Sequence, residues 1–261
     1  MGLTGFYERR QWVVVVALVL SSLACGCRSQ RHTLLTVSVA ASLTDAITVI
    51  EQSYMREHVG VELRNNSGSS GMLAQEIEQG APVDIFLSAA EGPMDDVVAK
   101  GLVAAGTRRN LLRNTLVLIA PRESQLRDFE GLADPSVRLI ALGDPATVPA
   151  GQYGKQTLMA LHLYEQVQPR LVLAKDVRQV LTYVEMGNVE AGIVYATDAQ
   201  KSDKVRVVAT APEASHDPIV YPVAVIRAGS NGSAARAFVE YLRSPEAMAI
   251  FAAQGFTMAA Q

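Results

Sequence analysis

Residues 143–155 read GDPATVPAGQYGK, and this stretch indicates most about the fold. An apolar run at residues 137–142, typical of a buried strand, precedes it, and a helical pattern with Tyr153 and Leu158 on one face follows. The stretch therefore predicts a loop between the end of a strand and the start of a helix. Unpaired N–H groups and the helix dipole at such a junction can bind an anion without a charged side chain. Ordinary connections share these features, so the interpretation depends on four similar junctions elsewhere.

Strands and helices alternate along almost the whole chain, which predicts an α/β fold with largely parallel sheets. The predicted strands are residues 34–41, 61–64, 83–87, 116–120, 137–142, 192–195, 205–209 and 219–226. The predicted helices are residues 45–58, 72–79, 92–100, 152–162, 177–186, 233–242 and 245–253. Residues 65–71, NNSGSSG, are predicted to be a loop.

Composition limits the class of protein. The 261 residues are 49% hydrophobic, enough for one large or two modest cores. The net charge of −3 gives no basic field for nucleic acid, so no nucleic-acid partner is expected. No internal repeat or low-complexity tract is present in the sequence.

The N-terminus has the pattern of an export signal. Arg9 and Arg10 precede an apolar run at residues 12–20, which is too short for a comfortable membrane span. The only cysteines, Cys25 and Cys27, lie where this signal ends, after Ser21, Ser22, Leu23 and Ala24. A small residue before a cysteine here resembles a bacterial lipobox, in which the cysteine is lipidated. Cys25 is favoured over Cys27 because it lies closer to the apolar run, and a plain cleaved signal with incidental cysteines is the alternative. Either way, the folded part can contain no disulfide.

Five positions at strand ends are candidates for a binding site: Ser42, Ser70, Ala150, Val177 and Tyr195. Each offers a hydroxyl or an N–H group, and none has a carboxylate or an ammonium of its own. In open α/β sheets, ligands bind outside the carboxyl ends of the strands. Singly, each position has a simpler explanation, as a helix N-cap, a turn residue or a core tyrosine. Their shared position at one sheet edge favours a site.

Several segments together resemble the periplasmic molybdate-binding proteins of ABC transporters. They are VSVAASLTDA, SSGMLAQEIEQGAPVDIFLSA, NTLVLIAP, GDPATVPAGQYGK, DVRQVL, GIVYATDA and PEASHDPIVYPVAV, in the family's order from Thr36 to about Phe256. The resemblance implies a two-lobed, type II binding-protein fold, with mostly parallel sheets flanked by helices. Two chain crossings, matched by residues 115–120 and 219–226, would form the hinge. The local departures are Gly71, where relatives often have serine or alanine, and Asn65-Asn66.

The same resemblance implies the domain limits and the ligands. The implied limits are a signal at 1–24, a linker at 25–33, lobe 1 at 34–115 plus 222–261, and lobe 2 at 116–221. The implied oxyanion ligands are the serine of ASLT (Ser42), a serine before the second helix (Ser70), the alanine of VPAG (Ala150), the valine of DVR (Val177) and the tyrosine of GIVY (Tyr195). The family binds molybdate or tungstate, with no cofactor and no metal cation. The resemblance also implies a permease partner and an exported, membrane-anchored monomer. The two serines are expected in one lobe and the other three ligands in the other.

A site that offers only hydrogen-bond donors suits an anion that carries no proton. A protonated phosphate would leave a buried donor without a partner, which costs about 1–3 kcal/mol. Sulfate, molybdate and tungstate are fully ionised at neutral pH, so hydrogen-bond logic cannot separate them. A binding protein for sulfate or another tetrahedral oxyanion therefore remains the alternative.

Two other classes of protein fit the sequence less well. A regulatory domain of the same fold would normally carry a DNA-binding helix-turn-helix, where this chain has a signal, and a cytoplasmic location would favour it. An enzyme lacks support because Pro149 and Gln156 break a phosphate-binding loop and no GxSxG or HExxH occurs. The four histidines have no metal-ligand spacing. Turnover of a phosphate or acyl ester would favour an enzyme.

Overall fold

The computed structural model describes residues 32–229 and 231–259. The predicted signal, Cys25 and Cys27 lie outside these residues. Two mixed sheets carry the fold, in the strand orders β11-β4-β10-β3-β1-β2 and β7-β6-β8-β5-β9. No helix among the described residues is long and apolar enough to cross a bilayer.

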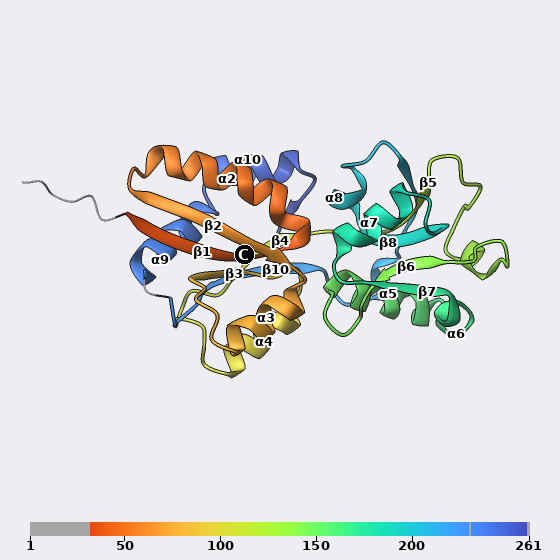
Figure 1. Cartoon of the computed structure of the whole chain (residues 1–261), viewed down its shortest axis with the longest axis horizontal. Coiled ribbons are helices and arrows are strands. Elements are labelled where there is room, and N and C mark those ends of the chain that lie inside the picture. Colours follow the sequence, from red (N-terminus) through yellow and green to blue (C-terminus); the bar gives the residue numbers. More distant parts are fainter. Residues whose placement is uncertain (1–31, 230, 260–261) are drawn as a thin grey trace, which may run out of the picture. The chain divides into compact units, whose positions relative to one another are not determined.

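The first sheet contains strands from both ends of the described chain. They are β1 (Thr33–Ala40), β2 (Val61–Gly68), β3 (Ile85–Leu87), β4 (Arg109–Arg113), β10 (Val220–Val225) and β11 (Thr257–Met258). Its helices are α2 (Thr44–Glu57), α3 (Ser70–Glu78), α4 (Glu91–Ala99), α9 (Gly232–Tyr241) and α10 (Pro245–Ala253), and the short turn η1 (Ala41–Leu43) precedes α2. Figure 1 shows α2 and α10 on one side of this sheet and α3 and α4 on the other.

The second sheet is built from the middle of the chain. Its strands are β5 (Leu116–Pro121), β6 (Ile140–Gly143), β7 (Leu171–Ala174), β8 (Ala191–Tyr195) and β9 (Val205–Thr210). Its helices are α5 (Pro149–Ala160), α6 (Tyr164–Val167), α7 (Val177–Glu185) and α8 (Ala196–Ala199), with short turns η2 (Glu130–Ala133), η3 (Gln168–Arg170) and η4 (Glu213–Ser215). In Figure 1, α7 and α8 lie on one side of this sheet and α5 and α6 on the other.

The prediction of largely parallel sheets is wrong, because five of the nine strand pairs in the described chain are antiparallel. β1 pairs in parallel with β2 and β3, and β6 pairs in parallel with β7 and β8. The crossing strands β5 and β10 run antiparallel to every strand they pair with. The reason is that β4 leads into β5 and β9 leads into β10, so the chain enters each sheet against the direction set by its βα units. The chain crosses twice between the sheets, as predicted. The exact lobe limits remain a prediction. β10 pairs with β4 of the first sheet from Val220 onward.

Tertiary pairing overrides local turn signals in β2. Residues 65–68, expected in a loop, instead extend β2 and pair with residues 37–40 of β1. β1 is buried from Val37 to Ala40, the part that pairs with residues 65–68, so a long parallel partner completes its hydrogen bonds there. β2 consequently ends at Gly68, directly before α3, and delivers Ser69 and Ser70 to the carboxyl edge of the sheet.

Candidate functional site

The helix N-termini that follow parallel strands meet at one small cavity. β2 leads to α3, β6 to α5 and β7 to α7, so three helices of nine to twelve residues begin there. The cavity is lined by Ala40, Ala41, Ser42, Gly68, Ser69, Ser70, Ala89, Val148, Pro149, Ala150, Asp176, Val177 and Tyr195. All five predicted residues are therefore brought together, and each is at most 4% exposed. Ser42 and Ser70 belong to first-sheet elements and the other three to second-sheet elements.

The space among these residues is about 10 Å³. This is roughly the volume that holds one water molecule. Pockets for drug-sized organic ligands are typically about 300–1,000 Å³. Only a very small solute, such as a single inorganic ion, can be seated here without a wide separation of the two sides.

Two serine hydroxyls of the cavity already accept or share a hydrogen bond. The N–H of Ala89 donates to Ser70 Oγ at 2.9 Å, so the Ser70 proton is free to be donated elsewhere. Ser42 Oγ lies 3.1 Å from the hydroxyl of Tyr221. Ser69 is also buried, and its Oγ has no hydrogen-bond partner among the described residues. Ser69 thus adds a third hydroxyl to the cavity.

Two backbone donors come from the second sheet's helices. Ala150 lies in the first turn of α5, whose N-cap residue provides no side-chain hydrogen bond. Val177 is the first residue of α7. No group within residues 32–229 and 231–259 accepts a hydrogen bond from either N–H. Because the first N–H groups of a helix have no partner inside it, both remain available to a ligand.

Tyr195 contributes a hydroxyl that reaches across to the first sheet. It ends β8, and its hydroxyl donates to the carbonyl of Ala89 at 3.4 Å, a long hydrogen bond. Burial raises the pKa of Tyr195 well above its usual value. The phenol is therefore neutral and remains a donor at physiological pH.

The cavity is neutral apart from one carboxylate. No lysine, arginine or histidine is among its lining residues in the described chain. The carboxylate belongs to Asp176, which the residue-by-residue prediction did not include. Its Oδ1 accepts from the N–H of Gln179 at 2.9 Å, so it caps α7. A residue just before a predicted helix is a common N-cap, and this signal could have identified it.

Charged residues beside the cavity are paired with one another. Asp45 on α2 accepts from Arg178 Nη2 at 2.8 Å and from Lys201 Nζ at 2.5 Å, which links the two sides. Arg178 Nε also lies 3.3 Å from Oδ1 of the fully buried Asp198. Burial raises the pKa of Asp198 to about 6, against the lowering effect of Arg178 and Lys201. These cations are therefore already neutralised.

A backbone contact closes one edge of the site. The N–H of Gly71, on α3, donates to the carbonyl of Thr147 at 2.9 Å. A Cβ at residue 71 would lie 2.6 Å from that oxygen, so only glycine permits this approach. The sequence departure at Gly71 therefore lies where the two sides touch.

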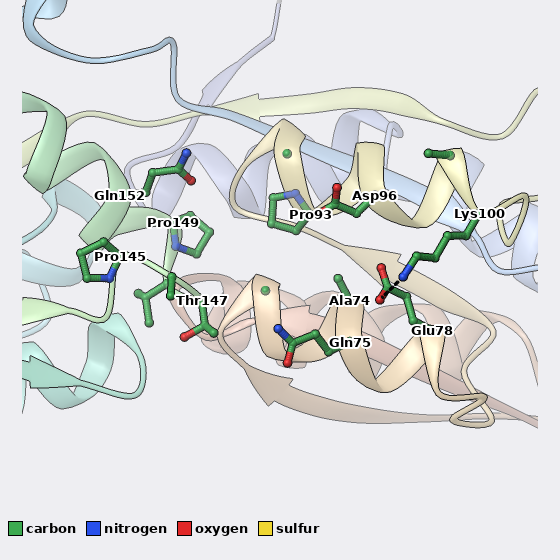
Figure 2. A pocket seen from close by; sticks show the side chains of 15 residues that line it. Ala74, Gln75, Glu78, Pro93, Asp96, Lys100, Pro145, Thr147, Pro149 and Gln152 are labelled. Atoms are coloured by element: carbon green, nitrogen blue, oxygen red, sulfur yellow. Dashed lines mark ion pairs between the residues drawn. The ribbon is translucent and has the colours of Figure 1, made fainter.

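A much larger cavity, about 510 Å³, lies next to this edge and contains none of the five predicted residues. Figure 2 shows Gln75 and Glu78 of α3, Asp96 of α4, Lys100 directly after α4, and Thr147 around this space. Lys100 and Glu78 form an ion pair at 2.5 Å. Within the described residues, no group of three or more metal-binding side chains is present.

Fold and cavity together define a binding protein for a small solute. The family model for bacterial extracellular solute-binding proteins matches residues 35–257. The chain belongs to this family, which is one of transport proteins rather than enzymes, as predicted.

Curated relatives match over nearly the full length. The putative ABC transporter substrate-binding lipoprotein YvgL of Bacillus subtilis is 42% identical over 94% of this chain and 97% of that protein. The molybdate-binding protein ModA of Escherichia coli is 40% identical over 95% of this chain and 99% of that protein. The predicted resemblance is thereby confirmed.

Solved structures confirm the fold. The periplasmic molybdate-binding protein of Azotobacter vinelandii is 25% identical, with a TM-score of 0.78 over 87% of this chain and all of that one. The substrate-binding domain of a putative molybdenum ABC transporter from Clostridium difficile is 39% identical, with a TM-score of 0.68 over the same shares. The sulfate-binding protein SubI of Mycobacterium tuberculosis, 16% identical with a TM-score of 0.75 over 86% of each chain, shares the fold.

Proposed function

We infer that this protein is the molybdate-binding component of an ABC transporter for molybdate. The observation that carries this inference is the cavity between the two sheets, whose described lining offers neutral donors and the capping carboxylate of Asp176 but no lysine, arginine or histidine. The name of the relative from Escherichia coli, a molybdate-binding protein that is 40% identical, supplies the ion. We propose that Ser42, Ser70, Ala150, Val177 and Tyr195 are its ligands, and that no cofactor or metal cation takes part.

The donor set matches the chemistry of a tetrahedral dianion. Three hydroxyls and two N–H groups can each donate to an oxygen of the anion, and hydrogen bonds to a charged acceptor are stronger than neutral ones. Oriented dipoles at the starts of α5 and α7 add partial positive charge. The negative charge is thus stabilised without a counter-ion that would also attract unrelated anions.

The two sides supply different donors, which suggests how binding is coupled to closure. Ser42 and Ser70 are on first-sheet elements, whereas Ala150, Val177 and Tyr195 are on second-sheet elements. An open protein can engage the anion with only one of these sets, so the anion favours the closed arrangement by its differential contacts. We propose that a permease recognises this closed arrangement and receives the ion from it.

Calorimetric titration of the mature protein tests the function. Molybdate and tungstate are expected to bind much more tightly than sulfate, and phosphate least, because a protonated phosphate needs an acceptor that the five ligands do not offer. Phosphate affinity equal to that of molybdate would contradict the donor-only site. Sulfate affinity equal to that of molybdate would instead support the alternative function, a binding protein for tetrahedral dianions in general.

We further propose that the protein is exported and anchored to a membrane by lipid on Cys25, or else on Cys27. The family is extracellular, and the relative from Bacillus subtilis carries the word lipoprotein in its name. Mass spectrometry of the mature N-terminus is expected to find a lipid-modified cysteine as the first residue. An unmodified N-terminus beyond Cys27 would contradict the anchor and leave a freely soluble exported monomer.

A further inference from the structure

We propose that Tyr221, oriented by Asn114, fixes Ser42 as a hydrogen-bond donor and so helps the site to reject protonated oxyanions. This inference rests on the function proposed above. Tyr221 lies in β10 and is 1% exposed, and it does not line the cavity. Its hydroxyl contacts Ser42 Oγ at 3.1 Å, 179 residues away in sequence. It is therefore a positioning residue, acting on the anion through Ser42.

The direction of the hydrogen bonds follows from Asn114. This residue lies between β4 and β5, and its Oδ1 accepts from the N–H of Thr115 at 2.8 Å. A backbone N–H only donates, so the amide oxygen must face it and the amide nitrogen must face the other way. Nδ2 then donates to the Tyr221 hydroxyl at 3.0 Å and to Thr197 Oγ1 at 2.9 Å.

The Tyr221 hydroxyl is consequently an acceptor toward Asn114 and keeps its own proton for another group. Ser42 Oγ lies at hydrogen-bond distance, 3.1 Å, and can take this proton, because a phenol is a stronger donor than an aliphatic alcohol. A lone pair of Ser42 Oγ is thereby occupied, and the serine's own proton is left for the anion.

Burial keeps this chain of hydrogen bonds in one direction. Tyr221 and Ser42 are each 1% exposed, so bulk water cannot substitute for either partner. Burial also raises the pKa of Tyr221 well above its usual value, so the phenol stays protonated. Ser70 is fixed as a donor in the same sense by the N–H of Ala89. Each serine oxygen thus already accepts a hydrogen bond from the protein. A protonated phosphate would need such an oxygen as an acceptor for its own proton.

The test compares anions in Tyr221→Phe, which removes the hydroxyl and keeps the ring. Without Tyr221's proton, Ser42 can turn and accept as well as donate. Molybdate affinity is expected to fall about tenfold, roughly the effect of one net hydrogen bond. Phosphate affinity is expected to stay constant or rise, so the molybdate-to-phosphate ratio narrows about tenfold. Phosphate is measured by the concentration that displaces molybdate, so that even millimolar affinities are recorded.

Two further variants distinguish a role of Tyr221 in orienting Ser42 from a general loosening of the protein's packing. Tyr54→Phe makes the same change in a buried tyrosine of α2 that packs on His58 and Phe238, and it is expected to leave the ratio unchanged. Asn114→Ala keeps Tyr221 but removes the amide donor that orients its hydroxyl. It is expected to narrow the molybdate-to-phosphate affinity ratio, and this result can be obtained even if Tyr221→Phe unfolds. Parallel losses for both anions in Tyr221→Phe, or an unchanged ratio in Asn114→Ala, would overturn the proposal.

Anion binding by the parent protein distinguishes a failure of the proposed function from a failure of the role proposed for Tyr221. If the parent binds sulfate rather than molybdate, the proposed function is wrong, but the sulfate-to-phosphate ratio in the same variants still tests the role of Tyr221. If the parent binds molybdate and the ratio does not change in the variants, the function stands and the role of Tyr221 is overturned.

Discussion

Replacing Gly151 by alanine is expected to cost about 3 kcal/mol of unfolding free energy, the upper end for overpacking, and to weaken molybdate binding severely. Gly151 lies in the first turn of α5, against the end of β6. A Cβ there would lie 1.9 Å from the carbonyl oxygen of Gly143 and 2.4 Å from its carbon. Both atoms belong to the backbone, so α5 itself must shift, and the N–H of Ala150 moves with it. Denaturant unfolding and calorimetry measure the two effects.

The matched control is Gly232→Ala in the first turn of α9, where a Cβ meets nothing within 4 Å. This variant is expected to keep both the stability and the affinity of the parent. Parent-like stability in Gly151→Ala would mean that the junction of β6 and α5 tolerates a shift. The close contact would then not be what fixes the position of Ala150.

Replacing Tyr195 by phenylalanine is expected to weaken molybdate binding by about 1.5–3 kcal/mol, or roughly 10- to 150-fold. The change removes one donor to a charged acceptor and keeps the buried ring. The hydroxyl's present hydrogen bond to Ala89 is long, at 3.4 Å, so the fold loses little. Calorimetry measures the affinity, and thermal unfolding checks that the fold is retained.

Tyr183→Phe, on α7 and outside the lining of the cavity, is the control for this variant and is expected to bind like the parent. If Tyr195→Phe binds molybdate as tightly as the parent does, Tyr195 is only a core tyrosine. The proposed set of ligands would then be wrong at that position.

The sequence predicted the order of most elements because their apolar patterns are strong, but it did not predict the direction of strand pairing. Direction depends on where the chain crosses between sheets. Residues 109–113, RNLLR, have only two apolar positions, and the apolar run LVLA at residues 171–174 is too short to distinguish a strand from part of a helix. Residues 65–68 show the opposite problem. Their asparagine, serine and glycine favour turns locally, yet the buried β1 needs a full-length partner and draws them into β2.

Site residues at strand ends could be predicted because parallel strands bring their carboxyl ends to one edge. Ser42, Ser70, Ala150, Val177 and Tyr195 do line one cavity, although their role as ligands remains a proposal. Tyr221 and Asn114 could not be found in this way. Tyr221 lies inside an apolar strand and resembles a core residue, and its partners are 107 and 179 residues away in sequence.

The absence of lysine, arginine and histidine from the described lining of the cavity also limits the range of its attraction. The potential of a dipole falls with the square of distance, whereas that of a charge falls only with the first power. If the cavity binds the anion as proposed, a chain of net charge −3 is expected not to draw dianions from the bulk but to bind those that reach the cavity. The same short range favours release of the anion. A small separation of the two sides is enough to weaken the attraction of the dipoles, whereas a fixed counter-charge would still attract the anion at that distance.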